Sequence, residues 1–351
     1  MTKKKIINKI FKNNKIVSIE KFIKLCLFSK EGYYKKSNVI GKEGDFITSS
    51  EISQLFGEIF GIFIIIIWQN KIKKKFNFIE LGPGNGTFLM DLLKITNKFK
   101  NFNKALNIHL IEKNINLIQK QQKKLLDKNY NLNKITWSKN FNIKNKEPSI
   151  IFANEFFDCF PIRQFYYKNN QWFEKMVTVN NDDCSLKFVD SKINQSIILN
   201  KLQKNSSMIL EISKSREDYF NKICRHINLN GGMIIIVDYG YTNYPSNFTL
   251  QSTYNNKKSN IFENIGEQDI TSLVDFGNLL YLSKKNKLNV EVFTTQREFL
   301  LQNGIKERGK KILENCNTVQ KKLIKKGLER IIDKEDMGSL FKVLVLSKWK
   351  K

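Results

Sequence analysis

Residues 76–87 read Phe76-Asn-Phe-Ile-Glu80-Leu-Gly82-Pro83-Gly84-Asn-Gly86-Thr87, and this stretch decides the fold. An apolar run ends in an acid, three glycines follow at alternate positions, and apolar residues then recur at helical spacing. The pattern predicts a β-strand, a tight turn and the start of a helix. Glycine has no Cβ, so it lets the backbone turn sharply and come close to a ligand.

The spacing of these glycines distinguishes the turn from the dinucleotide-binding fingerprint. That fingerprint is Gly-x-Gly-x-x-Gly, with a pyrophosphate at the helix N-terminus. Here the third glycine comes one residue early, and Thr87 stands in its place. Such a turn fits a ligand that has a cationic amino-acid end and lacks a pyrophosphate, and S-adenosylmethionine is such a ligand. The alternative is a tight turn that binds no ligand. We therefore predict that S-adenosylmethionine is bound by Glu80, Gly82, Pro83, Gly84, Gly86 and Thr87.

Strand and helix patterns alternate along the middle of the chain. Strands are predicted at 76–81, 106–111 and 148–153, separated by helices at 87–97 and 114–127. Such alternation predicts an α/β fold with a parallel sheet and helices on both faces. A further strand, helix and strand continue the alternation, at 208–212, 214–228 and 233–238.

Other segments interrupt or flank this core. Two strand-like runs on either side of Lys168-Asn-Asn-Gln171 predict a hairpin inserted into the sheet. Helical spacing is found at 18–29, 50–69, 271–285, 295–302, 304–313 and 317–328, and a final strand is predicted at 340–346. We predict an N-terminal helical segment, 1–75, packed on a core, 76–351, that has insertions at about 160–207 and 295–330.

The positive charge is spread unevenly. The chain has 60 Lys and Arg against 33 Asp and Glu, a net charge of +27, which in general favours nucleic-acid binding. No Lys or Arg occurs in five windows that keep several acids: 43–70, 77–93, 147–162, 231–256 and 261–283. This predicts a neutral to acidic cleft in a basic shell, which would attract a cationic cofactor or side chain and repel phosphate. It argues against RNA or DNA as the acceptor.

Cysteine spacing and hydropathy further limit the class of protein to which this chain can belong. The 5 cysteines are scattered, and no Cys-x-x-Cys pair occurs, so a metal site or a disulfide framework has little support. We expect a reducing compartment. The longest apolar run, 59–68, is shorter than the roughly 20 residues that span a bilayer. It predicts a buried helix and no membrane insertion.

Two more strand ends carry polar side chains. In a parallel sheet of this kind, ligands bind beyond the carboxyl ends of the strands. Glu112 ends the strand at 106–111, where a carboxylate can accept both ribose hydroxyls of the cofactor. The alternative is an acid favoured by the dipole of the next helix. Asn154, at the end of the strand at 148–153, is also predicted to lie beside the cofactor.

The segment after Asn154 reads Glu155-Phe-Phe-Asp158 and could serve a methyl acceptor. Methyl transfer from a sulfonium needs a lone pair about 3 Å from the methyl carbon. A guanidinium, with a pKa above about 12, offers one only if its proton is removed. Carboxylates can hold it by paired hydrogen bonds and take that proton, and an aromatic face can pack on the cation. Glu155 and Asp158 are the predicted catalytic carboxylates, with Phe156 or Phe157 as the face. The alternative is that the aromatics are core and Asp158 caps a turn.

Two acidic segments are candidates to complete the substrate cleft. Asp45 and Thr48 lie in a glycine-punctuated loop before a helix, and Ser49 or Ser50 would serve as its N-cap. Glu267 and Asp269 likewise precede a predicted helix, which Asp269 or Thr271 would cap. Helix capping alone explains these residues as well as substrate contact does.

With these residues in view, the chain resembles the MidA-like family of S-adenosylmethionine-dependent protein arginine methyltransferases, which are tied to assembly of respiratory complex I. The resemblance extends over nearly the whole length. The loop at 41–58 and the segment Asn154-Glu-Phe-Phe-Asp158 are what specify the family, and matching segments also include Asp238-Tyr-Gly240, 266–271 and 337–342. It implies a Rossmann-like seven-stranded class I methyltransferase core and symmetric dimethylation of an arginine on the NuoD-type subunit of complex I.

Two departures and two alternatives accompany the resemblance. Asn85 stands where an arginine is usual, and Ser50 replaces a common proline. The family-like region begins near 16–28, which leads us to expect a bacterial cytoplasmic protein, with the mitochondrial matrix as the alternative. A catalytically silent complex I assembly factor and an RNA methyltransferase are the competing functions.

Overall fold

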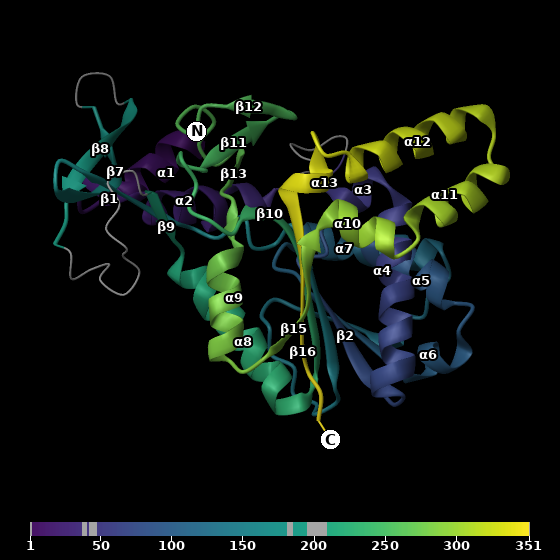
Figure 1. Ribbon diagram of the computed structural model, residues 1–351. Helices are drawn as coiled ribbons and strands as arrows, with labels where there is room; N and C mark the ends of the chain where they lie inside the picture. The colour runs from purple at the N-terminus through teal and green to yellow at the C-terminus, as the bar shows by residue number, and fades with distance from the viewer. Residues whose placement is uncertain (1, 37–40, 42–47, 181–184, 195–208, 351) are drawn as a thin grey trace. The chain divides into compact units, whose positions relative to one another are not determined.

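The computed structural model describes residues 2–36, 41, 48–180, 185–194 and 209–350 (Figure 1). The chain forms two compact units, each assembled from separated stretches. Unit 1 comprises 1–46, 157–219 and 241–278, and unit 2 comprises 47–156, 220–240 and 279–351. The division at residue 75 stays a prediction.

Unit 2 contains the main sheet, in which described strands follow the order β15-β16-β10-β5-β2-β3-β4. From β10 to β4 all neighbours are parallel, whereas β16 is antiparallel to both β10 and β15. This is the expected α/β fold with a largely parallel sheet. The strands are β2 (Phe76–Leu81), β3 (Leu106–Ile111), β4 (Ile135–Ser138), β5 (Ser149–Asn154), β10 (Gly232–Tyr241), β15 (Asn289–Thr295) and β16 (Phe341–Lys348).

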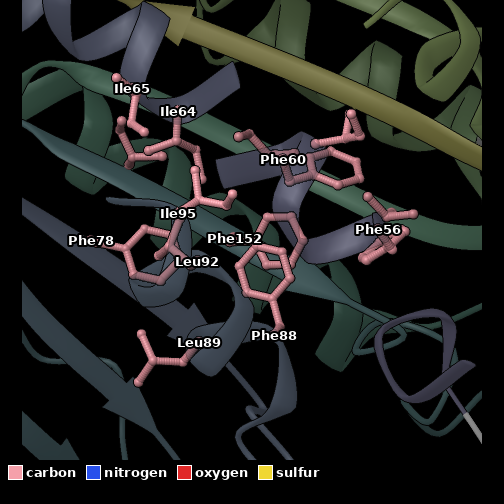
Figure 2. Packing of buried hydrophobic residues seen from close by; sticks show 14 of the residues in the cluster. Phe56, Phe60, Ile64, Ile65, Phe78, Phe88, Leu89, Leu92, Ile95 and Phe152 are labelled. Carbon is pink, nitrogen blue, oxygen red and sulfur yellow. The ribbon is translucent and has the colours of Figure 1, made fainter. Parts of the chain in front are cut away.

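Helices of unit 2 pack on this sheet through an aromatic core (Figure 2). Phe88 on α5 stacks on Phe152 of β5, with ring centroids 3.8 Å apart, and Phe60 on α4 meets Phe152 edge-on at 5.3 Å. The helices are α3 (Ser49–Ile52), α4 (Gln54–Ile67), α5 (Thr87–Thr96), α6 (Lys100–Ala105), α7 (Ile115–Asp127), α10 (Gln296–Gln302), α11 (Ile305–Glu314), α12 (Thr318–Ile332) and α13 (Met337–Leu340).

One helical stretch among the described residues, Gln54–Ile72, is long and apolar enough to cross a membrane by length and composition. More than half of it, 56%, is buried inside the protein. Its buried face includes Phe56, Phe60 and Ile64, which belong to the aromatic core. The stretch is therefore accounted for as a core helix, as the apolar run at 59–68 predicted.

The described residues of unit 1 form two antiparallel sheets. The larger joins β1 (Ile16–Ser18), β7 (Gln171–Val179), β6 (Arg163–Lys168) and β9 (Ile209–Ile212) in that order, with β8 (Leu186–Lys192) paired to β7. The smaller follows the order β12-β11-β13, with β11 at Gln251–Tyr254, β12 at Lys257–Ser259 and β13 at Asp269–Thr271. Helices α1 (Thr2–Ile10) and α2 (Ile19–Phe28) belong to the same unit.

Two expectations about this part of the chain were wrong. The strand predicted at 208–212 does not continue the parallel sheet, because β9 pairs antiparallel with β6. The predicted hairpin exists as β6 and β7, but it belongs to this separate sheet and is not inserted into the main one. Alternation along the sequence identifies strands, and it cannot identify their partners.

The hairpin turn explains why two asparagines follow one another. Asn169 and Asn170 have φ values of 50° and 57°, the left-handed pair typical of a type I′ turn, and Lys168 pairs with Gln171 across it. We expect Asn170→Ala to lower the free energy of unfolding by about 1 kcal/mol, because only Gly, Asn and Asp tolerate this region well. Asn170→Gly should cost nothing. Urea unfolding of the three proteins measures this, and equal stability of the Ala and Gly variants would contradict it.

Candidate functional site

The turn after β2 has the backbone conformation that its glycines predicted. Gly82, Gly84 and Gly86 all have positive φ values, of 64°, 54° and 73°. A Cβ at Gly82 would lie 2.9 Å from Cδ2 of Phe156, and one at Gly86 would lie 3.1 Å from Cγ of Gln121. The Gln121 amide also donates to the carbonyl of Gly84 at 2.7 Å. The turn is thus closely enclosed by neighbouring side chains, and only glycine fits it.

Two carboxylates lie at the ends of adjacent strands β2 and β3. Glu80 is 4% exposed, and burial followed by the negative charge of Glu112 raises its pKa to about 8. Burial also raises the pKa of Glu112, against the opposing effect of backbone N–H donors. Those donors include Lys113 at 2.7 Å, Asn114 at 2.8 Å and the turn residue Gly84. Asn114, not Glu112, caps helix α7, because its side chain accepts from the Asn116 N–H.

Unsatisfied oxygens mark the same edge of the sheet. Among the described residues, Oε2 of Glu80 and Oδ1 of Asn154 are buried and have no hydrogen-bond partner. Their strands are neighbours, with Leu81 paired to Ala153. Buried acceptors without donors are costly and rare in native proteins. A cationic donor, such as an ammonium group, would satisfy either atom, and at Glu80 it would also lower the pKa of the carboxyl.

Because the pKa of Glu80 is raised in the folded chain, the free energy of unfolding should depend on pH. The pKa is about 8 in the folded chain against an ordinary value of 4.5, so the folded state keeps this proton to higher pH than the unfolded state does. Its contribution is therefore fully present below about pH 4.5 and is lost as the pH rises towards 8. We expect the free energy of unfolding of ligand-free Glu80→Gln to gain about 4 kcal/mol over wild type between pH 5 and pH 9. Parallel pH dependences of the two proteins in urea titrations would contradict this.

Thr87 has a defined set of partners at the first position of α5. Its hydroxyl donates to the carboxylate of Glu51 on α3, and Nζ of Lys124 lies 3.5 Å from the same hydroxyl. Burial lowers the pKa of Lys124. Thr87 therefore connects the glycine turn to α3 and α7, which holds the start of α5 in place.

Glu155 has a strained backbone directly after β5. Its φ is 48°, a left-handed value that is uncommon for residues other than glycine and that clusters at functional sites. Its N–H donates to the carbonyl of Val237 at 2.9 Å. Its Oε1 accepts from the backbone N–H of Ser49 at 2.8 Å and from Nδ2 of Asn154 at 3.2 Å. The side chain is thereby given a fixed direction beside the carboxyl end of β5.

Asp238 belongs to the motif Asp238-Tyr-Gly240, and the sequence predicted no role for its side chain. It is fully buried near the end of β10, and its two oxygens accept from the backbone N–H groups of Phe156 at 3.2 Å and Tyr239 at 3.0 Å. It thus holds the segment that places Phe156 over Gly82. The sequence did contain a signal for this residue. Asp238 is an acid directly after the apolar run Met233–Val237, and an acid after an apolar run is also the pattern that identified Glu80.

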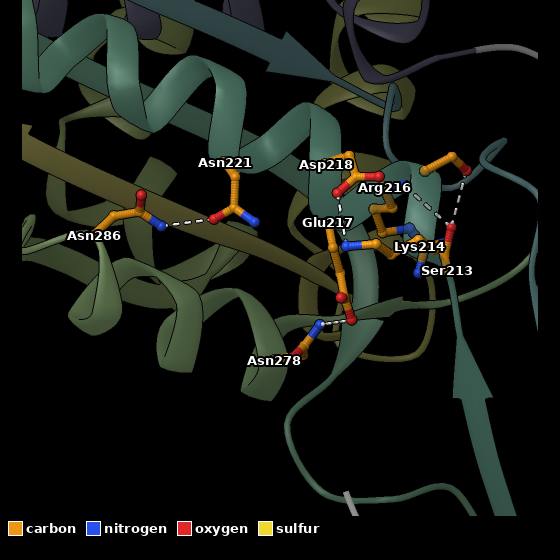
Figure 3. A network of polar contacts seen from close by, with 9 residues as sticks. Ser213, Lys214, Arg216, Glu217, Asp218, Asn221, Asn278 and Asn286 are labelled. Carbon is orange, nitrogen blue, oxygen red and sulfur yellow. Dashed lines mark hydrogen bonds and ion pairs between the residues drawn. The ribbon is translucent and has the colours of Figure 1, made fainter. Parts of the chain in front are cut away.

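Phe157 and Asp158 continue the same segment into unit 1. Phe157 is fully buried and stacks on Phe160 with centroids 5.7 Å apart, as a core aromatic does. The buried Arg216, near the start of α8 (Lys214–Asn230; Figure 3), donates to the carbonyl of Phe157 at 2.8 Å and to Oγ of Ser272 at 2.9 Å. The backbone carbonyl of Asp158 accepts from the N–H of Ser272 at 3.0 Å. Arg216 was missed, because a basic residue on a polar helix carries no local signal.

Tyr34 brings the predicted acids of unit 1 together. Its hydroxyl donates to Oδ1 of Asp269 at 3.0 Å. Burial raises the pKa of Tyr34 well above its usual value, and the charges of Asp269, Cys159 and Asp158 raise it further. Asp158 and Asp269 are 6% and 5% exposed. Two buried carboxylates therefore share the surroundings of one tyrosine.

Three predicted cleft residues remain, and each has a different outcome. Asp45 lies outside the described residues. Glu267 is half-buried in a turn, its N–H donating to the Asn264 carbonyl at 2.8 Å. Thr48 is the N-cap residue of α3, so the expectation that Ser49 or Ser50 caps this helix was wrong.

The helix predicted from residue 271 also begins later than expected. Asp269–Thr271 form strand β13, and α9 starts at Phe276. The carboxylate of Asp275 accepts from the Asn278 N–H at 2.8 Å, as an acid beside a helix start does. Neither Asp269 nor Thr271 caps this helix.

Comparisons with known proteins identify the family. Residues 59–294 match the model of an S-adenosyl-L-methionine-dependent methyltransferase family. The chain is 31% identical to the mitochondrial protein arginine methyltransferase NDUFAF7 homolog of Caenorhabditis elegans, over 94% of this chain and 82% of that one. It is also 31% identical to NDUFAF7 of Xenopus tropicalis, over 89% and 77%.

A solved structure supports the fold. A Burkholderia thailandensis protein bound to S-adenosyl-homocysteine superposes with a TM-score of 0.84 at 18% sequence identity. The match covers 99% of this chain and 92% of that one. At this identity the likeness concerns the fold.

Proposed function

The chain belongs to the family of S-adenosylmethionine-dependent methyltransferases that includes the NDUFAF7 arginine methyltransferases, and from this premise we propose that it methylates arginine side chains of a protein. The observation that carries the proposal is Glu155, a strained residue whose carboxylate is fixed at the end of β5 next to the glycine turn of β2. A carboxylate at this place suits a cationic acceptor and disfavours a phosphate-bearing one.

We assign the cofactor to the turn after β2 and its neighbours. The orphaned oxygens of Glu80 and Asn154 suit its ammonium group, and Glu112, which ends the next strand, suits the ribose hydroxyls. Bound S-adenosylmethionine supplies a methyl group activated by a sulfonium. The glycines let the backbone come close to it, and Phe156 covers the turn. Pro83 and Thr87 complete the predicted set.

We assign acceptor binding and proton removal to Glu155. Its carboxylate would accept hydrogen bonds from the guanidinium and orient one nitrogen towards the methyl group. It would then take the proton that the nitrogen loses on methylation. Asp158 and Asp269, whose charges both act on Tyr34 in unit 1, stay predicted acceptor residues, and their Asn variants are the direct test.

The finer identity of the acceptor rests on family resemblance. We propose symmetric dimethylation of an arginine on the NuoD-type subunit of complex I, in support of its assembly. The two relatives named above are called mitochondrial. We propose the cytoplasm of a bacterium for this chain, with the mitochondrial matrix as the alternative.

The decisive experiment is methyl transfer to purified acceptor. Labelled S-adenosylmethionine is incubated with the enzyme and the NuoD-type subunit, and arginine-containing peptides are analysed by mass spectrometry. We expect dimethylarginine at one position, with fragment ions that report its symmetry. The matched control is the subunit with that arginine changed to lysine, which should take no label. Cofactor binding without any transfer would favour the silent assembly factor instead.

A further inference from the structure

The backbone of Ser49 forms a contact that links distant parts of unit 2. Its N–H donates to Oε1 of Glu155 at 2.8 Å, although the two residues are 106 positions apart in sequence. The Ser49 hydroxyl donates to Oε1 of Gln296 at 3.2 Å, and Gln296 in turn donates to the carbonyl of Ile331 at 2.8 Å. Ser49 and Gln296 are both fully buried. The segment that reaches Glu155 is therefore itself anchored to α10 and to the end of α12.

The position of Ser49 in α3 explains why its N–H is available. It is the first residue of the helix, directly after the N-cap residue Thr48. The first N–H groups of a helix have no acceptor within the helix. A backbone donor also cannot rotate away, as the end of a lysine or serine side chain can. Its bond fixes a flexible glutamate side chain at little cost to the rest of the fold.

We propose that Ser49 is a positioning residue, whose backbone N–H holds the Glu155 carboxylate in the orientation used by the methyl acceptor. The inference rests on the proposed function of Glu155. It adds to that function a role for the start of α3, which brings a rigid donor to the acceptor carboxylate. The hydroxyl of Ser49 anchors the start of α3 to Gln296, and the backbone N–H of Ser49 holds the carboxylate of Glu155.

A pair of substitutions separates these two roles. Ser49→Ala keeps the N–H and removes only the hydroxyl, whereas Ser49→Pro removes both. Proline is well tolerated at the first position of a helix. It requires an extended residue before it, and Thr48 has φ −77° and ψ 164°. We expect kcat of the proline variant to be at least tenfold below that of the alanine variant, since charge-assisted hydrogen bonds are the strong ones. The dissociation constant of S-adenosylmethionine should be equal in the two.

The split between kcat and cofactor binding distinguishes positioning from damage to the fold. A merely structural effect would lower the unfolding midpoint and weaken cofactor binding together with kcat. Equal kcat values for the two variants would overturn the inference while leaving the arginine methyltransferase proposal intact.

A second measurement does not depend on the acceptor. Amide hydrogen exchange should show the Ser49 N–H protected in wild type and exchanging at least tenfold faster in Glu155→Asn. Asparagine tolerates positive φ, and its side chain is one carbon shorter than that of glutamate. Unchanged protection in this variant would refute the hydrogen bond. If wild type transfers no methyl group to any arginine, the proposed function fails, and the exchange result still decides whether Ser49 holds Glu155.

Discussion

Glu155→Gln is expected to lower kcat for arginine methylation by about a thousandfold and to leave the dissociation constant of S-adenosylmethionine within about twofold of wild type. Glutamine keeps the size of the side chain and an oxygen that can accept from the Ser49 N–H, so the contact at 2.8 Å can persist. It cannot take a proton, and its NH₂ group would face the N–H groups of a guanidinium. Steady-state kinetics and calorimetry measure the two quantities separately.

The control for this variant is Glu329→Gln. It removes one carboxylate from an exposed position on α12, so net charge changes equally while the site is untouched. Its kcat should equal that of wild type. If Glu155→Gln retains more than a tenth of wild-type kcat, Glu155 does not orient the acceptor or remove its proton.

Gly82→Val is expected to weaken S-adenosylmethionine binding at least a hundredfold and so to abolish methylation at ordinary cofactor concentrations. The position has φ 64°, which β-branched residues hardly ever adopt, and the added Cβ would lie 2.9 Å from the ring of Phe156. Both effects displace the turn on which the cofactor proposal depends. Calorimetric titration with S-adenosylmethionine gives the affinity directly.

Gly304→Val provides the matched control. Gly304 also has a positive φ, of 81°, at the N-cap of α11, but the nearest atom to an added Cβ is 3.7 Å away. The variant should lose stability through backbone strain and still bind the cofactor within threefold of wild type. Comparable loss of binding in both variants would mean that general destabilisation, and not the turn, explains the effect of Gly82→Val.

Local sequence signals predicted the cofactor end of the sheet well. The strand predicted at 76–81 has the same bounds as β2, and the glycines place the turn because only they tolerate its backbone. Pairing could not be predicted in the same way. Strand β9 has the apolar character of a parallel core strand, and its antiparallel partner β6 is set by tertiary contacts.

Edge strands were missed for a related reason. The residues of strand β15 are exposed or half-buried, and β4 has only four residues. Neither strand therefore contains the apolar run that marks a central strand. At the site, Glu80, Glu112 and Glu155 could be proposed because each follows an apolar run. The partners of Glu155 could not, because Ser49 lies 106 residues earlier and contributes a backbone group that every residue has. Arg216 and Tyr34 were missed because their polar partners are distant in sequence.

The place of β16 has a consequence for how the protein is made. This strand, the last in the chain, lies between β10 and β15 and pairs with both, with Ile235 opposite Val345 and Phe293 opposite Leu344. Until β16 has been synthesised, the edge of β10 on this side has no partner. Unpaired strand edges are prone to association with other chains. We therefore expect a chain truncated before residue 341, which lacks β16, to aggregate through the open edge of β10.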